Sequence, residues 1–122
     1  MDIETSLKQA MEIEGAVGVA LVDYESGMAL GSLGGGRYLN LEVAAAGNTE
    51  VIRAKMRTMA SLDLNDEIED ILITLGRQYH LIRLMGSNRS ASLFIYLALD
   101  RTRANLAMAR HQLRRIENDL DV

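Results

Sequence analysis

Residues 91–99 read ASLFIYLAL, and this stretch is the strongest indicator of the architecture. It carries no charged side chain and shows no alternation between apolar and polar residues. A strand that is apolar on both faces is typical of a sheet whose two faces are both covered. We therefore predict a central strand here, with helices packed on each side of the sheet.

Four other segments have the length and the apolar composition of strands. Residues 17–23 (VGVALVD) and 28–33 are joined by DYESG at 23–27, in which Asp, Ser and Gly are turn-forming residues. Residues 68–75 and 78–85 are rich in Ile and Leu and are separated by only two residues. Links this short predict antiparallel pairing, since parallel strands need long crossover connections.

Three segments have apolar residues at helical spacing, namely 2–13, 40–62 and 101 to about 119. Asn40 and Asp100 are predicted to cap the second and third of these helices. The order α-β-β-α-β-β-β-α predicts an α/β fold of the α+β type, with a five-stranded antiparallel sheet. Because each helix must bury its apolar stripe against the sheet, we expect the long middle helix on one face and the two terminal helices, as a pair, on the other.

The composition is that of a globular chain. Its 122 residues suit one domain, 1–122, and 48% apolar with 25% charged residues excludes an intrinsically disordered chain. The absence of cysteine excludes disulfides, thiolate metal sites and cysteine nucleophiles. A net charge of -4 predicts no nucleic acid partner, because an acidic domain repels phosphate backbones. No apolar stretch reaches the ~20 residues of a membrane helix and no signal peptide is visible, so we expect a cytoplasmic protein without membrane insertion.

The helix predicted at 40–62 carries a long apolar stripe with two polar residues inside it. At about 100° per residue the stripe contains Leu41, Ala44, Ala45, Val51, Ile52, Met56, Met59 and Leu62. Asn48 and Lys55 lie almost in line on this stripe. Either both lie at its margin and reach water, or they pair with a partner helix at a two-fold axis and fix its register, as a buried Asn does in coiled coils.

The strand predicted at 68–75 would be open to pairing with another chain if it lies at an edge of the sheet. Ile71 and Ile73 lie on one of its faces, and it has neither the Pro nor the Lys that commonly block such edges. An unblocked edge offers backbone donors and acceptors to a second copy of the chain. The predicted homodimer interface comprises Ala45, Asn48, Ile52, Lys55, Met56, Met59, Ile71 and Ile73.

No arrangement typical of catalysis is visible in the sequence. His80 and His111 have neither a Ser nor an acid at a recognisable motif spacing. The glycines at 34–36 are followed by Arg37, so the Lys-Ser/Thr pair of a phosphate-binding loop is missing and a flexible connector is expected. The oxygen-rich stretch 63–70 lacks the glycine and glutamate positions of a calcium-binding loop. We therefore predict no catalytic residue, no cofactor and no metal site.

Five arginines lie in or beside the last predicted helix: Arg101, Arg103, Arg110, Arg114 and Arg115. They lie mainly on the side opposite its apolar stripe. This side is either a solvated face or a surface that binds an acidic partner.

Taken together, several segments resemble the roadblock/dynein light chain family, in its short single-domain bacterial type. They are GAVGVALVDYESG at 15–27, the Ala-rich middle helix, EDILITLGRQYHLIRLM at 69–85 and the helix that follows LALD at 97–100. The resemblance covers roughly 3–120 and implies a profilin-like layout, with the sheet between one long helix and a helix pair. It also implies homodimers in which the third strands pair edge to edge and the long helices pack together.

The resemblance implies a function as well. Members of this family regulate or scaffold Ras-like small GTPases or serve as dynein light chains, and they are not known for a catalytic residue set. We therefore expect a non-enzymatic homodimer that modulates the nucleotide state or the localisation of a small GTPase, with Arg37 as a candidate contact residue. The alternatives are a structural adaptor that binds no GTPase and a sensor of a small ligand.

Overall fold

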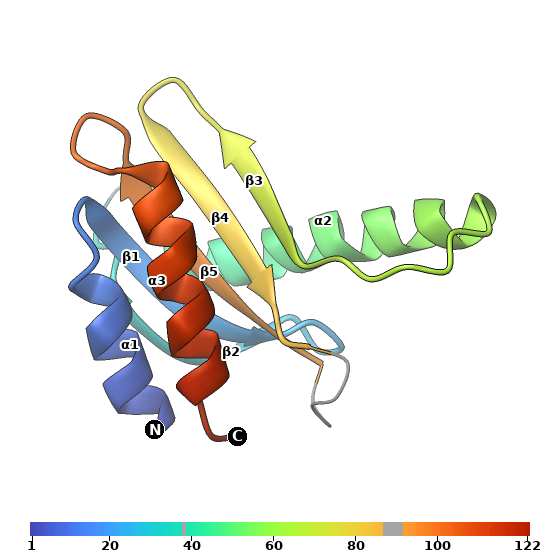
Figure 1. Cartoon of the computed structure of the whole chain (residues 1–122), viewed down its shortest axis with the longest axis horizontal. Coiled ribbons are helices and arrows are strands. Elements are labelled where there is room, and N and C mark those ends of the chain that lie inside the picture. Colours follow the sequence, from blue (N-terminus) through green and yellow to red (C-terminus); the bar gives the residue numbers. More distant parts are fainter. Residues whose placement is uncertain (38, 87–91) are drawn as a thin grey trace.

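A computed structural model of the chain describes residues 1–37, 39–86 and 92–122, and over these residues the predicted order of helices and strands is confirmed (Figure 1). The elements are α1 (Ile3–Met11), β1 (Ala16–Asp23), β2 (Met28–Gly34), α2 (Leu41–Ser61), β3 (Asp70–Thr74), β4 (Gln78–Leu84), β5 (Leu93–Asp100) and α3 (Leu106–Asp119). Residue 91, with which the predicted central strand begins, lies outside the described residues.

The strands form one antiparallel sheet in the order β2-β1-β5-β4-β3. β5 is the central strand, as predicted, because it pairs with β1 on one side and with β4 on the other. Every residue from Leu93 to Leu99 is buried. β3 lies at one edge of the sheet and β2 lies at the other, so β3 occupies the position that edge-to-edge pairing requires.

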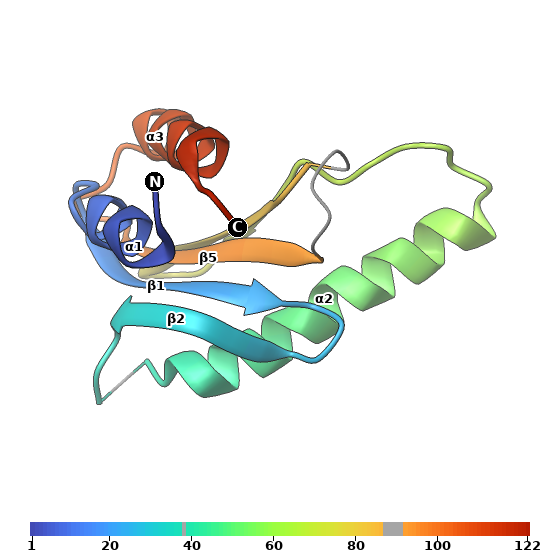
Figure 2. The same ribbon diagram turned by 90° about the horizontal axis from the view of Figure 1, so that it is seen from below.

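Helices cover both faces of the sheet and create two apolar cores (Figure 2). On one face α1 and α3 lie side by side, and residues such as Leu7 and Leu113 pack against Leu97 of the central strand. On the other face α2 packs Leu41, Ala45 and Ile52 against the sheet. The predicted division into a terminal helix pair and a long middle helix is confirmed.

The start of α3 corrects one prediction. The helix begins at Leu106 rather than Arg101, and its N-cap is Asn105, whose side chain accepts a hydrogen bond from Met108 N at 3.1 Å. Asp100 instead caps the preceding turn, since its Oδ1 accepts hydrogen bonds from Thr102 N at 2.9 Å and from Thr102 Oγ1 at 2.8 Å. Thr102 is exposed in this turn.

The buried face of α2 differs from the predicted stripe. Val51 and Leu62 are exposed, whereas Thr49 is buried against the sheet. Thr49 can be buried because its hydroxyl donates to the carbonyl of Ala45 at 2.8 Å, which satisfies its hydrogen-bonding group within the helix. The stripe that faces the chain's own sheet is therefore narrower and shorter than the apolar pattern of the sequence.

Candidate functional site

The second half of α2 extends beyond the sheet (Figure 2). The helix makes its main sheet contacts with β1 and β2. Ile52 is its last buried residue, and on the same face only Met56 and Met59 beyond it are even half-buried. Among the described residues, no helix combines the length and the apolar composition needed to cross a membrane. We refer to 53–61 as the α2 overhang.

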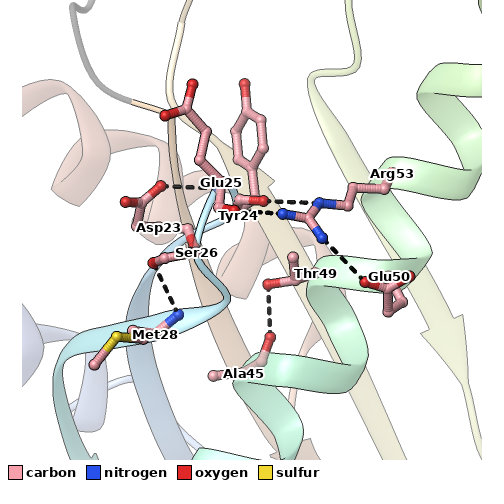
Figure 3. Close-up of polar contacts among 9 residues, drawn as sticks. All are labelled: Asp23, Tyr24, Glu25, Ser26, Met28, Ala45, Thr49, Glu50 and Arg53. Atoms are coloured by element: carbon pink, nitrogen blue, oxygen red, sulfur yellow. Dashed lines mark hydrogen bonds and ion pairs between the residues drawn. The ribbon is translucent and has the colours of Figure 1, made fainter.

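Arg53 fixes the direction in which the overhang leaves the sheet (Figure 3). Its Nε donates to the carbonyl of Tyr24 at 3.1 Å and its Nη2 donates to the carbonyl of Glu25, both in the turn between β1 and β2. Its Nη1 pairs with Glu50 Oε1 at 3.2 Å. The turn itself is held by Asp23, whose Oδ1 accepts from Glu25 N at 2.9 Å. The guanidinium thus joins α2 to the β1–β2 turn.

The C-terminal end of the overhang is capped by backbone hydrogen bonds. Asp63 adopts a left-handed φ of 54°, its N–H donates to the carbonyl of Ala60 at 3.1 Å, and Leu64 N donates to the carbonyl of Met59 at 3.0 Å. These two bonds are the Schellman pattern that satisfies the last carbonyls of a helix. The overhang is therefore an ordered helical segment with an apolar pair, Met59 and Leu64, at its tip.

An open hollow of about 420 Å³ lies beneath the overhang. Its apolar lining includes Met56, Met59, Leu64 and Ile68, with Tyr24 at the sheet. Its lining also contains the carboxylates of Asp66, Glu67, Glu69 and Glu117 and the guanidinium of Arg83. Methionine side chains are flexible and polarizable and are common on surfaces that bind partners. The hollow therefore continues the half-buried apolar face of the overhang.

The edge strand β3 borders the same side of the sheet. Ile71 packs at the margin of the α2-side core, and Ile73 is half-buried opposite His80 of β4. β4 pairs with one side of β3, and the other side has no strand partner among the described residues. Its backbone donors and acceptors are available to a further strand.

His80 is a hydrogen-bonded histidine on this face of the sheet. Its Nδ1 lies 3.2 Å from Tyr96 Oη, its Nε2 lies 2.8 Å from Gln78 Oε1, and its ring meets the Tyr96 ring edge to face at 5.3 Å. Burial lowers the pKa of His80 and raises the pKa of Tyr96 to about 12. The imidazole is therefore neutral. Its Nδ1 accepts a hydrogen bond from the hydroxyl of Tyr96, and its Nε2–H donates a hydrogen bond to the amide oxygen of Gln78.

The lowered pKa of His80 predicts how stability changes with pH. In the unfolded chain this histidine has its ordinary pKa of about 6.5. As the pH falls, the unfolded chain therefore binds a proton here at a higher pH than the folded chain does. We expect the stability that the neutral form contributes to be present above pH 6.5 and lost as pH falls through the folded pKa. The measurement is urea unfolding of the wild type and of His80→Gln between about pH 7.5 and about pH 5. Parallel stability curves for the two proteins would contradict the assignment.

The predicted interface residues divide into two groups. Ala45 and Ile52 are 1% and 0% exposed and pack in the chain's own core, so neither side chain offers surface to a partner. The other six residues are Asn48, Lys55, Met56, Met59, Ile71 and Ile73. Lys55 is exposed and the other five are half-buried, along α2 and β3.

The remaining candidate residues lie elsewhere. Arg37 is exposed in the connection between β2 and α2, directly after three glycines with φ of 76°, 79° and 101°. These left-handed φ values explain why glycine occupies each of the three positions. His111 is exposed on α3. Within the described residues, no three His, Asp or Glu side chains are placed to hold a metal ion.

A buried ionic cluster on the opposite face of the sheet is not apparent from the sequence. Arg83 of β4 pairs with Glu117 of α3 at 3.3 Å and lies 3.9 Å from Asp70 of β3. Arg110 of α3 also pairs with Asp70, at 2.7 Å. The cluster ties α3 to the edge strand. Its members are far apart in the sequence, and no local motif indicates it.

Comparison with solved structures identifies the architecture, whereas no family model and no curated protein matches the sequence. A roadblock/LC7 domain from Streptomyces avermitilis superimposes with a TM-score of 0.79 at 10% identity, over 97% of this chain and 93% of that chain. The chain has the roadblock fold. The gliding protein MglB from Thermus thermophilus gives a TM-score of 0.77 at 16% identity, over 93% and 82% of the two chains. A structure of MglB with a tetrameric arrangement gives 0.76 at 17% identity, over 93% and 81%. Each of these three structures matches more than nine-tenths of this chain.

Proposed function

We propose that this protein is a single roadblock-like domain, residues 1–122, that forms a homodimer and regulates or scaffolds a Ras-like small GTPase in the cytoplasm without being an enzyme. The observation that carries the proposal is the α2 overhang, which contains no fully buried residue. Met56 and Met59 lie only half-buried on one face of this segment, and Leu64 at its tip is exposed. A second molecule that packs against this face would remove its apolar surface from water.

The edge strand supports a second copy of the chain as this molecule. Antiparallel pairing of two β3 edges about a two-fold axis would join the sheets. Each overhang would then lie over the β3–β4 half of the other sheet, where Ile71, Ile73 and His80 are half-buried. Asn48 and Lys55 would approach the axis on α2, where polar residues fix register. The likeness to MglB with a tetrameric arrangement supports self-association.

The proposed mechanism is positional. The composite surface of the dimer would bind one conformation of the switch loops of the GTPase and so shift a pre-existing equilibrium between conformations. Arg37 is the candidate contact residue, because it is exposed directly after a glycine-rich connection. We expect Arg37→Ala to leave any stimulated hydrolysis of GTP largely unchanged, since catalysis would use residues of the GTPase itself.

The experiment is an affinity pull-down from native lysate, divided between a GTP analogue and GDP, with the bound proteins identified by mass spectrometry. The expected result is one small GTPase enriched in one nucleotide state. Partners that are unchanged by nucleotide would contradict GTPase regulation and favour the structural adaptor. Thermal stabilisation by a metabolite, without any protein partner, would favour the ligand sensor.

A further inference from the structure

Positive charge is concentrated in the last third of the chain. Residues 77–122 contain eight basic and four acidic residues, whereas 1–76 contain five basic and thirteen acidic residues. The arginines at 101, 103, 110, 114 and 115 are all exposed. Such a division gives an acidic protein one surface that attracts anionic groups.

Arg101 fixes the β5–α3 turn against the tip of the β3–β4 hairpin. Its backbone N–H donates to the carbonyl of Arg77 at 3.1 Å, and its Nη1 donates to the carbonyl of Leu75 at 2.7 Å. Its guanidinium lies 5.1 Å from the centre of the Tyr79 ring. The backbone that carries Arg77 is therefore held next to the turn that carries Arg101 and Arg103.

Arg110 joins the first half of α3 to the edge strand. Its Nε and Nη2 donate to the two carboxylate oxygens of Asp70 at 3.2 Å and 2.7 Å. Arg114 follows one turn later on the same flank of the helix, and it is exposed without an ion-pair partner among the described residues. We call the set Arg77, Arg103, Arg110 and Arg114, with the exposed Thr74 and Leu75, the α3 surface.

We propose that the α3 surface binds an acidic segment of a partner protein. The planar guanidinium forms two parallel hydrogen bonds with a carboxylate, as Arg110 already does with Asp70, and it loses less hydration than an ammonium group. The exposed Leu75 adds apolar contact beside the charges. Arg77, Arg103 and Arg114, held on joined elements, can thus bind carboxylates that are spaced along one extended segment, while Arg110 remains paired with Asp70.

The distribution of charge favours a short protein segment over nucleic acid. Duplex DNA carries one charge per ~1.7 Å and would extend from the α3 surface over the acidic remainder of the molecule. Tyr79, the aromatic ring of this region, is already covered by Arg101 and is half-buried, so it offers no free platform for a base. A short acidic segment meets neither obstacle.

The α3 surface is separate from the α2 overhang, on which the proposed function rests. α3 and α2 lie on opposite faces of the sheet (Figure 2), so a partner on the α3 surface leaves the α2 overhang accessible. The protein could then hold two different partners at once. The inference does not depend on the homodimer or on the GTPase.

The test uses a synthetic fluorescein-labelled peptide in which glutamate alternates with leucine and serine, and its binding is followed by fluorescence anisotropy. We expect the wild type to bind this peptide and to lose affinity as NaCl is raised. Arg114→Glu is expected to weaken binding about tenfold, because it replaces an attraction by a repulsion. The control is Lys8→Glu, the same charge change at an exposed position of α1, which packs against β1 and β2 and is expected to stay within about twofold.

Circular dichroism of both variants establishes that they are folded. Failure of the folded wild type to bind the peptide would overturn the proposal, and so would an equal loss of affinity in Lys8→Glu and Arg114→Glu. Tighter binding to duplex DNA, or to vesicles containing phosphatidylserine, than to the peptide would also overturn it. None of these outcomes bears on the nucleotide-dependent pull-down, so the two proposals fail separately.

Discussion

Replacing Arg83 by methionine is expected to lower the free energy of unfolding by about 3 kcal/mol. The guanidinium is 12% exposed and lies between Glu117, which is 7% exposed, and Asp70, which is 13% exposed. Removing one partner of a buried ion pair leaves the other charge in a medium where it is poorly solvated. Asp70 retains its pair with Arg110, so the contact between Arg83 and Glu117 is the ion pair between β4 and α3 that the substitution removes.

Urea unfolding measures this effect, and two further variants sharpen it. Arg114→Met removes an exposed arginine of α3 and is expected to change the free energy of unfolding by less than about 0.5 kcal/mol. The double variant Arg83→Met/Glu117→Leu is expected to recover much of the loss, because burying neither charge costs less than burying one alone. A double variant at least as unstable as Arg83→Met alone would show that the contact does not act as an ion pair.

Ile73→Asp is expected to convert the proposed homodimer into a folded monomer. In the proposed interface the two edge strands approach a two-fold axis, so the substitution would bury an unpaired carboxylate in each copy. We expect the dissociation constant of the dimer to rise at least about a hundredfold, equivalent to about 2.7 kcal/mol. Light scattering over a range of protein concentrations gives the molecular mass, and circular dichroism shows that the monomer is folded.

The sheet supplies its own control for this experiment. Leu30→Asp introduces the same charge on β2, at the opposite edge of the sheet, where the native leucine is already exposed. This variant is expected to remain a dimer. A monomeric wild type, or equal dissociation of both variants, would show that β3 is not the interface.

Local chemistry made most of the elements predictable. The doubly apolar pattern of residues 91–99 placed a strand at the centre of the sheet, and Asn40 caps α2 as expected, with its side chain accepting from Glu42 N at 3.0 Å. The predicted start of α3 was wrong. Asp100 and Asn105 are both good N-cap residues, and the sequence alone does not show which of them precedes the helix.

Features that depend on distant segments were not predictable from the sequence. Arg53 binds backbone carbonyls 28 and 29 residues away, and these have no side-chain signature. The apolar stripe of α2 predicts that one face of the helix is buried. The spacing of the apolar residues does not show whether the chain's own sheet or a partner buries that face. Val51 and Leu62 belong to this stripe and are exposed in the chain alone.

Because Arg53 attaches α2 to the β1–β2 turn, the part of the helix beyond it can act as a rigid lever arm. Nine residues follow Ile52 in the helix, a length of about 13 Å at 1.5 Å per residue. A rotation of about 10° at the attachment would move the tip, with Met59 and Leu64, by about 2 Å. Because the β1–β2 turn holds that attachment, a change of sequence between residues 23 and 27 would shift the tip of the lever without altering a residue of the overhang itself. The angle between two subunits could thus be adjusted from a turn that lies outside their interface.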